Sequence, residues 1–152
     1  MARGDVKLFA AYDKVAHDGV AFTIGTNTLK MGIVTSATVP TVGTADPRWG
    51  TGGSTNFSTN EVATATAYTG PITLTNVTWT RSSGVITLDF DNVTVAQDAS
   101  GFTNAAYAII YNDTVAGKYC IGFIDLGGPV SIVSGALNIN INASGFATHT
   151  AS

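Results

Sequence analysis

Residues 105–126 read AAYAIIYNDTVAGKYCIGFIDL, and this stretch decides the fold. Its two arms, residues 105–111 and 118–126, carry apolar side chains at both odd and even positions. Short continuous apolar runs bounded by polar residues are typical of strands that are buried on both faces. A polar, glycine-containing connection joins the arms at residues 112–117. We therefore expect two neighbouring strands at the centre of the protein.

Alternating patterns flank this central pair. Residues 85–90 (VITLDF) and 136–142 (ALNININ) place apolar and polar side chains on opposite faces, as in half-buried strands. Residues 72–81 (ITLTNVTWTR) alternate twice with a change of phase, which predicts a β-bulge near Asn76. The tripeptide at 82–84 (SSG) is a hairpin turn signal between two of these runs.

Three further strands are expected at residues 28–35, 62–68 and 146–150, which brings the total to about eight, with turns at intervals of about 8–12 residues. No helical period is sustained along the chain. This pattern predicts an all-β, single-domain, antiparallel β-sandwich with a jelly-roll-like arrangement of strands.

The 152 residues are enough for one domain core. We expect residues 28–152 to form the β-sandwich and residues 1–27 to form a peripheral arm that can exchange between subunits. Residues 36–60 are rich in Gly, Pro, Ser and Thr and predict a long loop. Loops of this length in compact domains usually have a function, so this segment is the first candidate for a contact surface.

Only 11% of the residues are charged, and the net charge is −3. Lys and Arg form no cluster, which argues against a nucleic-acid partner. The apolar runs are too short to cross a membrane, and no secretory signal pattern is present at the N-terminus. A surface with so few charges is poorly protected against association, as suits a component of an assembly.

The residue patterns indicate no enzyme. His17 and His149 stand near opposite ends of the chain without partners at catalytic or metal-ligand spacing, and no nucleophile motif occurs. Asp89 and Asp91 lie two positions apart on a strand, so their carboxylates point to the same face and could contribute to a Ca²⁺ site. Polar side chains that face solvent along a strand explain this pattern better. The single cysteine, Cys120, lies in an apolar run and is interpreted as a buried hydrophobic residue. We expect neither a cofactor nor a metal.

Three motifs resemble segments of small virion proteins from tailed bacteriophages in their order and spacing. They are residues 29–36 (LKMGIVTS), 107–114 (YAIIYNDT) and 121–127 (IGFIDLG). The resemblance extends over residues 28–145 and does not include the N-terminal arm. It implies a β-sandwich structural protein without enzymatic residues, assembled in the host cytoplasm and located in the virion, on the capsid surface.

The resemblance implies a capsid decoration (cement) protein that binds and stabilises the major capsid protein shell. We expect it to self-associate, with a trimer favoured by the threefold positions of shells. The residues expected at capsid or subunit interfaces are Phe9, Tyr12, Arg48, Trp49 and Phe57. One alternative is a tail or head–tail connector component. Another, of a different class, is a carbohydrate-binding module that uses Trp49 and a Ca²⁺ ion.

Overall fold

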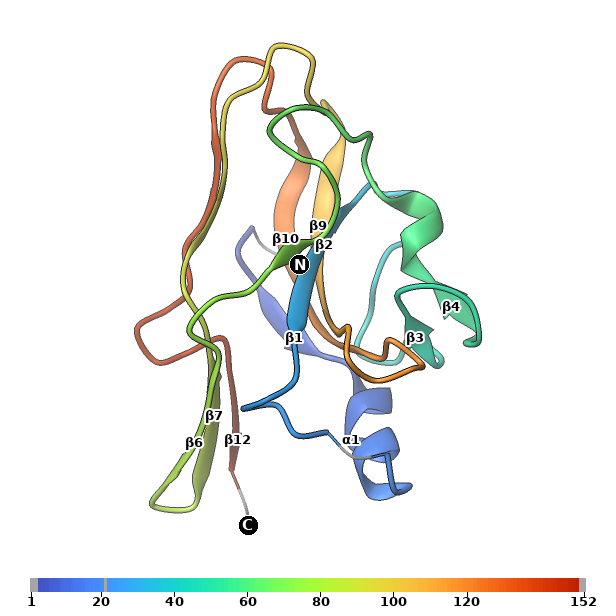
Figure 1. The fold of residues 1–152 in the computed structure, drawn as a ribbon, viewed down its shortest axis with the longest axis vertical. Coiled ribbons are helices and arrows are strands. Elements are labelled where there is room, and N and C mark those ends of the chain that lie inside the picture. Colours follow the sequence, from blue (N-terminus) through green and yellow to red (C-terminus); the bar gives the residue numbers. More distant parts are fainter. Residues whose placement is uncertain (1–2, 21, 151–152) are drawn as a thin grey trace.

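The computed structural model describes residues 3–20 and 22–150. Its largest element is a five-stranded antiparallel sheet in the order β1-β10-β9-β2-β5 (Figure 1). The strands are β1 (Val6–Leu8), β10 (Cys120–Val130), β9 (Ala105–Asn112), β2 (Leu29–Val34) and β5 (Ile72–Thr73). The two apolar runs identified in the sequence are thus neighbouring strands at the middle of this sheet, as predicted.

Burial explains why β9 and β10 occupy the middle. Ile109 and Ile110 are adjacent in sequence and point to opposite faces of the sheet, yet both are fully buried. Ile121 and Phe123 on β10 are fully buried as well. Strands with apolar side chains on both faces leave water only when other elements cover each face, and this requirement places them between two layers.

Smaller sheets complete the covering layers. The strands β8 (Val93–Val95) and β11 (Leu137–Ile139) form an antiparallel pair, and β6 (Thr78–Ser82), β7 (Val85–Asp89) and β12 (Ala147–Thr150) form a three-stranded sheet in the order β12-β7-β6. Both sheets lie along the left side of the molecule in Figure 1. Their inward side chains, such as Val95, Leu137 and Leu88, join the same apolar core as β9 and β10. The predicted all-β, sandwich-like fold is therefore confirmed.

The remaining elements lie on the opposite side of the central sheet. They are the helix α1 (Ala10–His17), the short parallel pair β3 (Pro47–Arg48) and β4 (Thr55–Asn56), and the 3-10 helix η1 (Phe57–Asn60). The predicted loop at 36–60 thus contains short regular elements of its own. The side chain of Asn56 holds it together, because its Oδ1 accepts hydrogen bonds from the N–H groups of Gly50 and Ser58.

The strand predicted at residues 62–68 is wrong. Val62 and Tyr68 are buried, but the chain between them turns, with the N–H of Ala65 donating to the carbonyl of Tyr68. The Tyr68 hydroxyl accepts the N–H of Ile33 and donates to Glu61, at 3.0 and 2.8 Å. Together with the N–H of Val62, which donates to the carbonyl of Ile33, this side chain satisfies the backbone of Ile33 without a continuous strand at 62–68.

Other predictions differ in detail. The phase change at Asn76 is a break between β5 and β6, and Asn76 adopts a left-handed φ of 50° instead of forming a bulge. The strand β10 continues through Gly127 and Gly128, where positive φ angles of 86° and 107° accompany a register shift. Glycine adopts such angles without steric cost, so the chain bends there and does not end. Strand β8 was not predicted at all.

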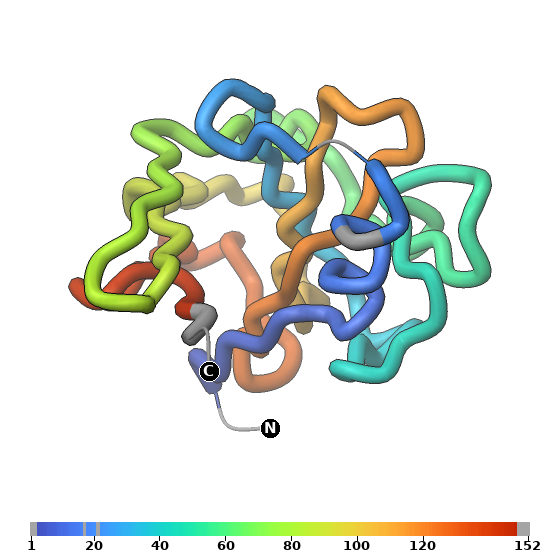
Figure 2. The backbone as a smooth tube through the Cα atoms, turned by 90° about the horizontal axis from the view of Figure 1, so that it is seen from below, coloured from blue at the N-terminus to red at the C-terminus, as the bar shows by residue number. Residues whose placement is uncertain are grey.

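The described part of the N-terminal segment, expected to form a peripheral arm, packs against the central sheet of its own chain. Strand β1 pairs with β10, and the next residue, Phe9, enters the core before α1 begins. Seen from below, this segment crosses beneath the central strands to reach α1 (Figure 2). The described part of residues 1–27 is therefore integrated into the same domain, because its apolar side chains complete the core of its own chain.

Candidate interaction surfaces

Four of the five residues predicted to form an interface lie inside the core. Phe9, Tyr12, Trp49 and Phe57 are 1%, 7%, 6% and 0% exposed. The ring of Phe9 lies 5.8 Å from that of Phe57 and 5.1 Å from that of Phe123, between centroids. Their own chain covers these rings, so they offer no surface to a partner. Sequence reasoning missed this because loop residues were assumed to be exposed.

Trp49 is buried for a specific reason. Its indole stacks on the ring of Tyr111 with centroids 5.0 Å apart and planes at 5°. The same indole lies over Gly32 on β2, where any side chain would overlap it. Gly32 therefore creates the space that Trp49 fills, and the long loop is anchored to the central sheet through this contact.

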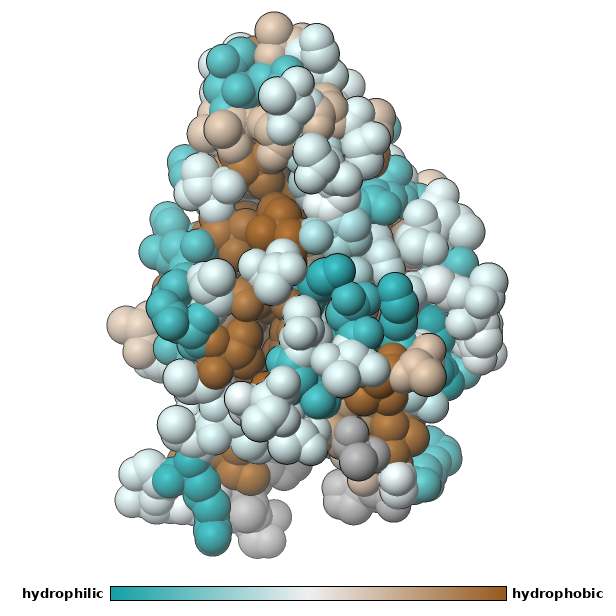
Figure 3. All heavy atoms as spheres, in the orientation of Figure 1, coloured by the Kyte–Doolittle hydropathy of each residue, from teal (hydrophilic) through white to brown (hydrophobic). Residues whose placement is uncertain are grey.

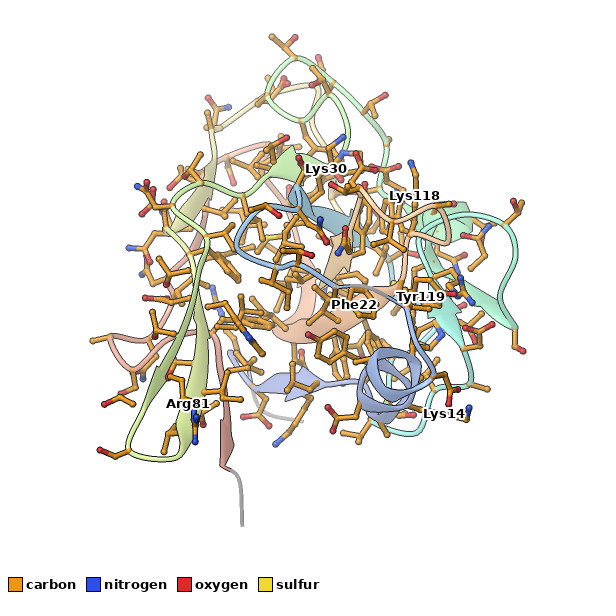
Figure 4. The ribbon with its side chains drawn as sticks, turned by 60° about the horizontal axis from the view of Figure 1, so that its bottom comes forward. Lys14, Phe22, Lys30, Arg81, Lys118 and Tyr119 are labelled. Atoms are coloured by element: carbon orange, nitrogen blue, oxygen red, sulfur yellow. The ribbon has the colours of Figure 1, made fainter. Side chains whose placement is uncertain are left out.

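Arg48, the fifth predicted residue, lines a small pocket of about 330 Å³ with Lys14, Asp18 and Tyr119. Its guanidinium lies 3.5 Å from the centroid of the Tyr119 ring, and its Nε donates to Asp46 at 2.7 Å. Burial works to lower the pKa of Arg48, but the hydrogen bond with Asp46 raises it above its usual value. Figure 4 shows Tyr119 beside Phe22 and close to α1, which carries Lys14.

The charges of this pocket are already paired with one another. Lys14 forms an ion pair with Asp18, and Arg48 forms one with Asp46. A charged ligand would have to displace these internal partners. The pocket is therefore a weak candidate for binding a charged ligand.

A second charged group links β2 to the connection between β9 and β10. Asp113 forms ion pairs with Lys30 at 2.8 Å and with Lys118 at 3.1 Å. Burial works to raise the pKa of Asp113, but the hydrogen bonds from the two lysines lower it below its usual value. Figure 4 places Lys30 and Lys118 on the same upper side of the molecule. This cluster ties the β9–β10 connection to β2.

The pKa of Asp98 is also lowered, because its carboxylate accepts the backbone N–H groups of Ala67 and Ser100, each at 2.9 Å.

A carboxyl whose pKa is lower in the folded state adds stability above its unfolded pKa, and this stability is lost as the pH falls. We expect the melting temperature to decrease once the pH falls through the ordinary pKa of an unfolded Asp, about 3.9, and to go on decreasing until Asp98 and Asp113 are protonated in the folded state. Scanning calorimetry from pH 7 to pH 3 measures this. The variants Asp98→Asn and Asp113→Asn should each flatten the acid slope, and an unchanged slope in both would contradict the assignment.

Asp89 and Asp91 do not come together as a metal site. Asp91 accepts hydrogen bonds from Thr75 and Asn76, both at 2.8 Å, and Asp89 accepts the N–H of Phe90. Within residues 3–20 and 22–150, no group of three or more His, Cys, Asp or Glu side chains is placed to hold a metal ion.

The exposed apolar side chains are different from those predicted. The large hydrophobic residues exposed in the described part of the chain are Val39 (54%), Val42 (48%) and Trp79 (40%). Val39 and Val42 lie in the predicted loop at 36–60, so this segment does present an apolar surface, but through other residues. Both follow threonine within a Pro- and Gly-containing stretch, which carries no periodic signal of burial or exposure.

The face of the molecule shown in Figure 3 agrees with the low content of charge. Weakly polar residues, drawn pale, cover most of it, and apolar atoms remain visible between the side of the β6–β7 hairpin and the central sheet. Few charges protect such a surface from contact with another protein.

A groove with a volume of about 540 Å³ lies between β1 with its partner β10 and the segment around β11. Val6 and Leu126 line one side, and Leu137, Asn138 and Asn140 line the other. Strand β1 is an edge of the five-stranded sheet, and β11 belongs to a separate two-stranded sheet. Two strand edges thus face a shared groove.

Hydrogen bonds show which backbone groups point into this groove. On the β11 side, the N–H of Ile141 donates to Asn92, next to β8, and the directly opposite side chains of Asn138 and Thr94 are 2.9 Å apart. Backbone groups alternate along a strand, so both observations indicate that Asn138 and Thr94 face each other without backbone hydrogen bonds between them. The N–H and C=O of Asn138 therefore point away from β8, to the free edge.

The same reasoning applies to β1. The N–H of Phe9 and the carbonyl of Asp5 bond to β10, at 3.0 Å each. Because backbone groups alternate along a strand, those of Val6 point away from β10. In the part of the chain that the structure describes, the groove therefore presents outward-pointing backbone donors and acceptors from β1 and β11, among both apolar and polar side chains.

No family model, curated protein or solved structure matches this chain. In the part of the chain that the structure describes, no helix is long and apolar enough to cross a membrane.

Proposed function

We propose that this chain is a virion structural protein of a tailed bacteriophage, a capsid decoration protein that binds the major capsid protein and stabilises the shell. The observation that carries the proposal is the groove between β1 and β11. Its outward-pointing backbone groups and its mixed apolar and polar lining fit an extended segment of another protein, which would add a strand between the two edges.

The composition of the surface supports the same role. Val39 and Val42 are exposed on the segment at 36–60, and charged residues make up only 11% of the chain. Each bound copy adds free energy that would be lost if the shell opened, so occupancy of many equivalent sites stabilises the closed shell. The resemblance of residues 28–145 to small phage virion proteins points in this direction as well.

The carbohydrate-binding alternative loses its main argument. That alternative relies on Trp49 stacking on a sugar ring, but the indole is buried against Tyr111. A tail or head–tail connector component would use the same kind of protein contacts as a decoration protein. Copy number distinguishes these two, because a shell has many equivalent sites and a tail or connector has few.

Quantitative mass spectrometry of purified particles tests the proposed function. We expect a copy number comparable with that of the major capsid protein, or a simple large fraction of it. A few copies per particle would place the protein in the tail or connector instead. Its absence from particles would overturn a virion role.

The variant Asn138→Pro tests the groove. Proline removes an N–H that points into the groove and leaves the hydrogen bonds to β8 in place. We expect its affinity for assembled shells to fall at least about tenfold, the equivalent of one or two lost hydrogen bonds. Sedimentation with shells and a thermal melt measure binding and folding separately.

Asn138→Ala is the matched control. It removes the side-chain contact with Thr94 but keeps the backbone N–H, so it should bind as the parent does. Equal binding by the proline and alanine variants would show that the capsid protein docks elsewhere.

A further inference from the structure

The hairpin of β6 and β7 projects from the body at the lower left of Figure 1, with β6 outermost. Its two-residue turn consists of Ser83 and Gly84, with φ angles of 48° and 81°. Positive φ at both positions is typical of a type I′ turn, which matches the twist of the flanking strands. The turn therefore fixes the register, in which Ser82 pairs with Val85 and Trp79 with Leu88.

The outer edge of β6 has unused backbone groups. In a two-residue hairpin the pair next to the turn, here Ser82 and Val85, is hydrogen bonded. Alternation then directs the backbone of Thr80 toward β7 and the backbones of Trp79 and Arg81 toward the free edge. All five residues of β6 are exposed, and no proline or register shift interrupts its pairing with β7.

The side chains on this edge are exposed. Trp79 is 40% exposed, and within residues 3–20 and 22–150 Arg81 forms no salt bridge. Figure 4 shows Arg81 on the hairpin, well apart from the labelled lysines. Trp79 and Arg81 are two positions apart on one strand, so they lie on the same face. Tryptophan and arginine are among the residues that contribute most to protein interfaces.

We propose that β6 pairs with β6 of a second copy of this chain, antiparallel and centred on Thr80, to form a continuous six-stranded sheet. In this register Trp79 lies directly opposite Arg81 of the second copy, and the two-fold axis repeats the pair. Both residues direct their backbone groups across the interface, so four hydrogen bonds form. Each Arg81 contacts an indole, a favourable cation–π arrangement.

Neighbouring registers are worse. Centring the pairing on Arg81 places the two guanidinium groups opposite each other, and like charges directly across a sheet are destabilising. The register centred on Arg81 also requires residues of the turn, Ser83 and Gly84, to act as strand partners. Centring it on Trp79 leaves Arg81 opposite the chain just before β6, close to the left-handed Asn76. The register centred on Thr80 uses the whole of β6 and only β6.

This contact closes with two copies, because the same strand serves as both partners. It gives a dimer, whereas a trimer needs a heterologous contact. The interface is small, so association in solution depends on concentration. It does not rest on the capsid proposal, although neighbouring copies held on a shell would pair more readily than free ones.

Two substitutions at one position test the pairing and its register. Trp79→Lys places a lysine opposite Arg81 of the second copy and should weaken dimerisation at least about tenfold. Trp79→Glu removes the same indole but places a carboxylate there, so it should retain a dimer that weakens with salt. Sedimentation velocity over a range of concentrations measures both, and circular dichroism checks the fold.

The outcomes separate the alternatives. If the pairing were centred on Trp79, the variants would place Glu opposite Glu and Lys opposite Lys. Loss of the dimer in both variants would therefore show that the register centred on Thr80 is wrong. A parent protein that remains monomeric at all concentrations would overturn the proposal altogether.

A cysteine at the axis provides a second test. Residues at the centre of the pairing face each other without hydrogen bonds, with Cα atoms about 4.5 Å apart, within the range of a disulfide. Thr80→Cys should therefore form a disulfide-linked dimer on mild oxidation. Thr78→Cys is the control, because its partner in the second copy is Ser82. The native Cys120 is buried, and burial raises its pKa, so it should not compete. Equal cross-linking of both variants would contradict the register.

Discussion

Replacing Trp49 by alanine is expected to destabilise the protein by about 3–5 kcal/mol, as for other large buried aromatic residues. The indole stacks on Tyr111, and its removal would leave a cavity above Gly32, in the middle of the central sheet. For a domain of this size the melting temperature should fall by roughly 6–20 °C. Chemical denaturation and calorimetry measure the two quantities.

Trp79→Ala is the matched control, because Trp79 is 40% exposed and its loss should cost less than about 1 kcal/mol. Gly32→Ala supplies a second comparison. In the parent its new methyl group would overlap the indole, whereas in the Trp49→Ala background the same methyl group enters vacated space. Similar losses for Trp49→Ala and Trp79→Ala would show that the loop at 36–60 is not anchored as described.

Replacing Phe9 by alanine is expected to cost a similar amount, about 3–5 kcal/mol. Phe9 is 1% exposed and lies between the rings of Phe57 and Phe123, so it joins the N-terminal segment to both η1 and β10. Urea unfolding followed by intrinsic fluorescence measures the loss. The loss should be the same at low and high protein concentration, because the contacts lie within one chain.

Lys7→Ala is the control for this experiment, since Lys7 is exposed on β1, two residues before Phe9, and should contribute little. A loss in Phe9→Ala that disappears at low concentration, where neighbouring copies dissociate, would indicate that the N-terminal segment inserts into a neighbouring copy. That result would restore the exchanged arm predicted from the sequence.

Local patterns were sufficient for most of the fold. The continuous apolar runs of β9 and β10 and the alternation of β7 and β11 correctly predicted strands, because a strand's two faces are directly encoded by odd and even positions. The hairpin turn at Ser83 and Gly84 followed from the conformations that these residue types tolerate. The strand predicted at 62–68 failed because residues 60–62 meet the edge of β2 only briefly, and the hydroxyl of Tyr68 takes the N–H of Ile33 where a longer strand would have paired.

The candidate surfaces were much less predictable. The segment at 36–60 was correctly singled out as unusual, but its tryptophan is buried and its valines Val39 and Val42 are exposed. The free edges at the groove were not foreseen, because an edge is defined by which strands do not pair. Nothing in the sequence of β1 or β11 alone carries that information.

By itself, the amino-acid sequence determined the all-β class, the central strand pair and the low charge of the surface, since these depend on composition and on neighbours along the chain. The tertiary structure alone decided that Phe9, Trp49 and Phe57 belong to the core and that Trp79 does not. The physical reason is that burial depends on contacts between distant segments. An indole in a loop is buried only when a gap exists for it elsewhere, and Gly32 on β2 provides that gap.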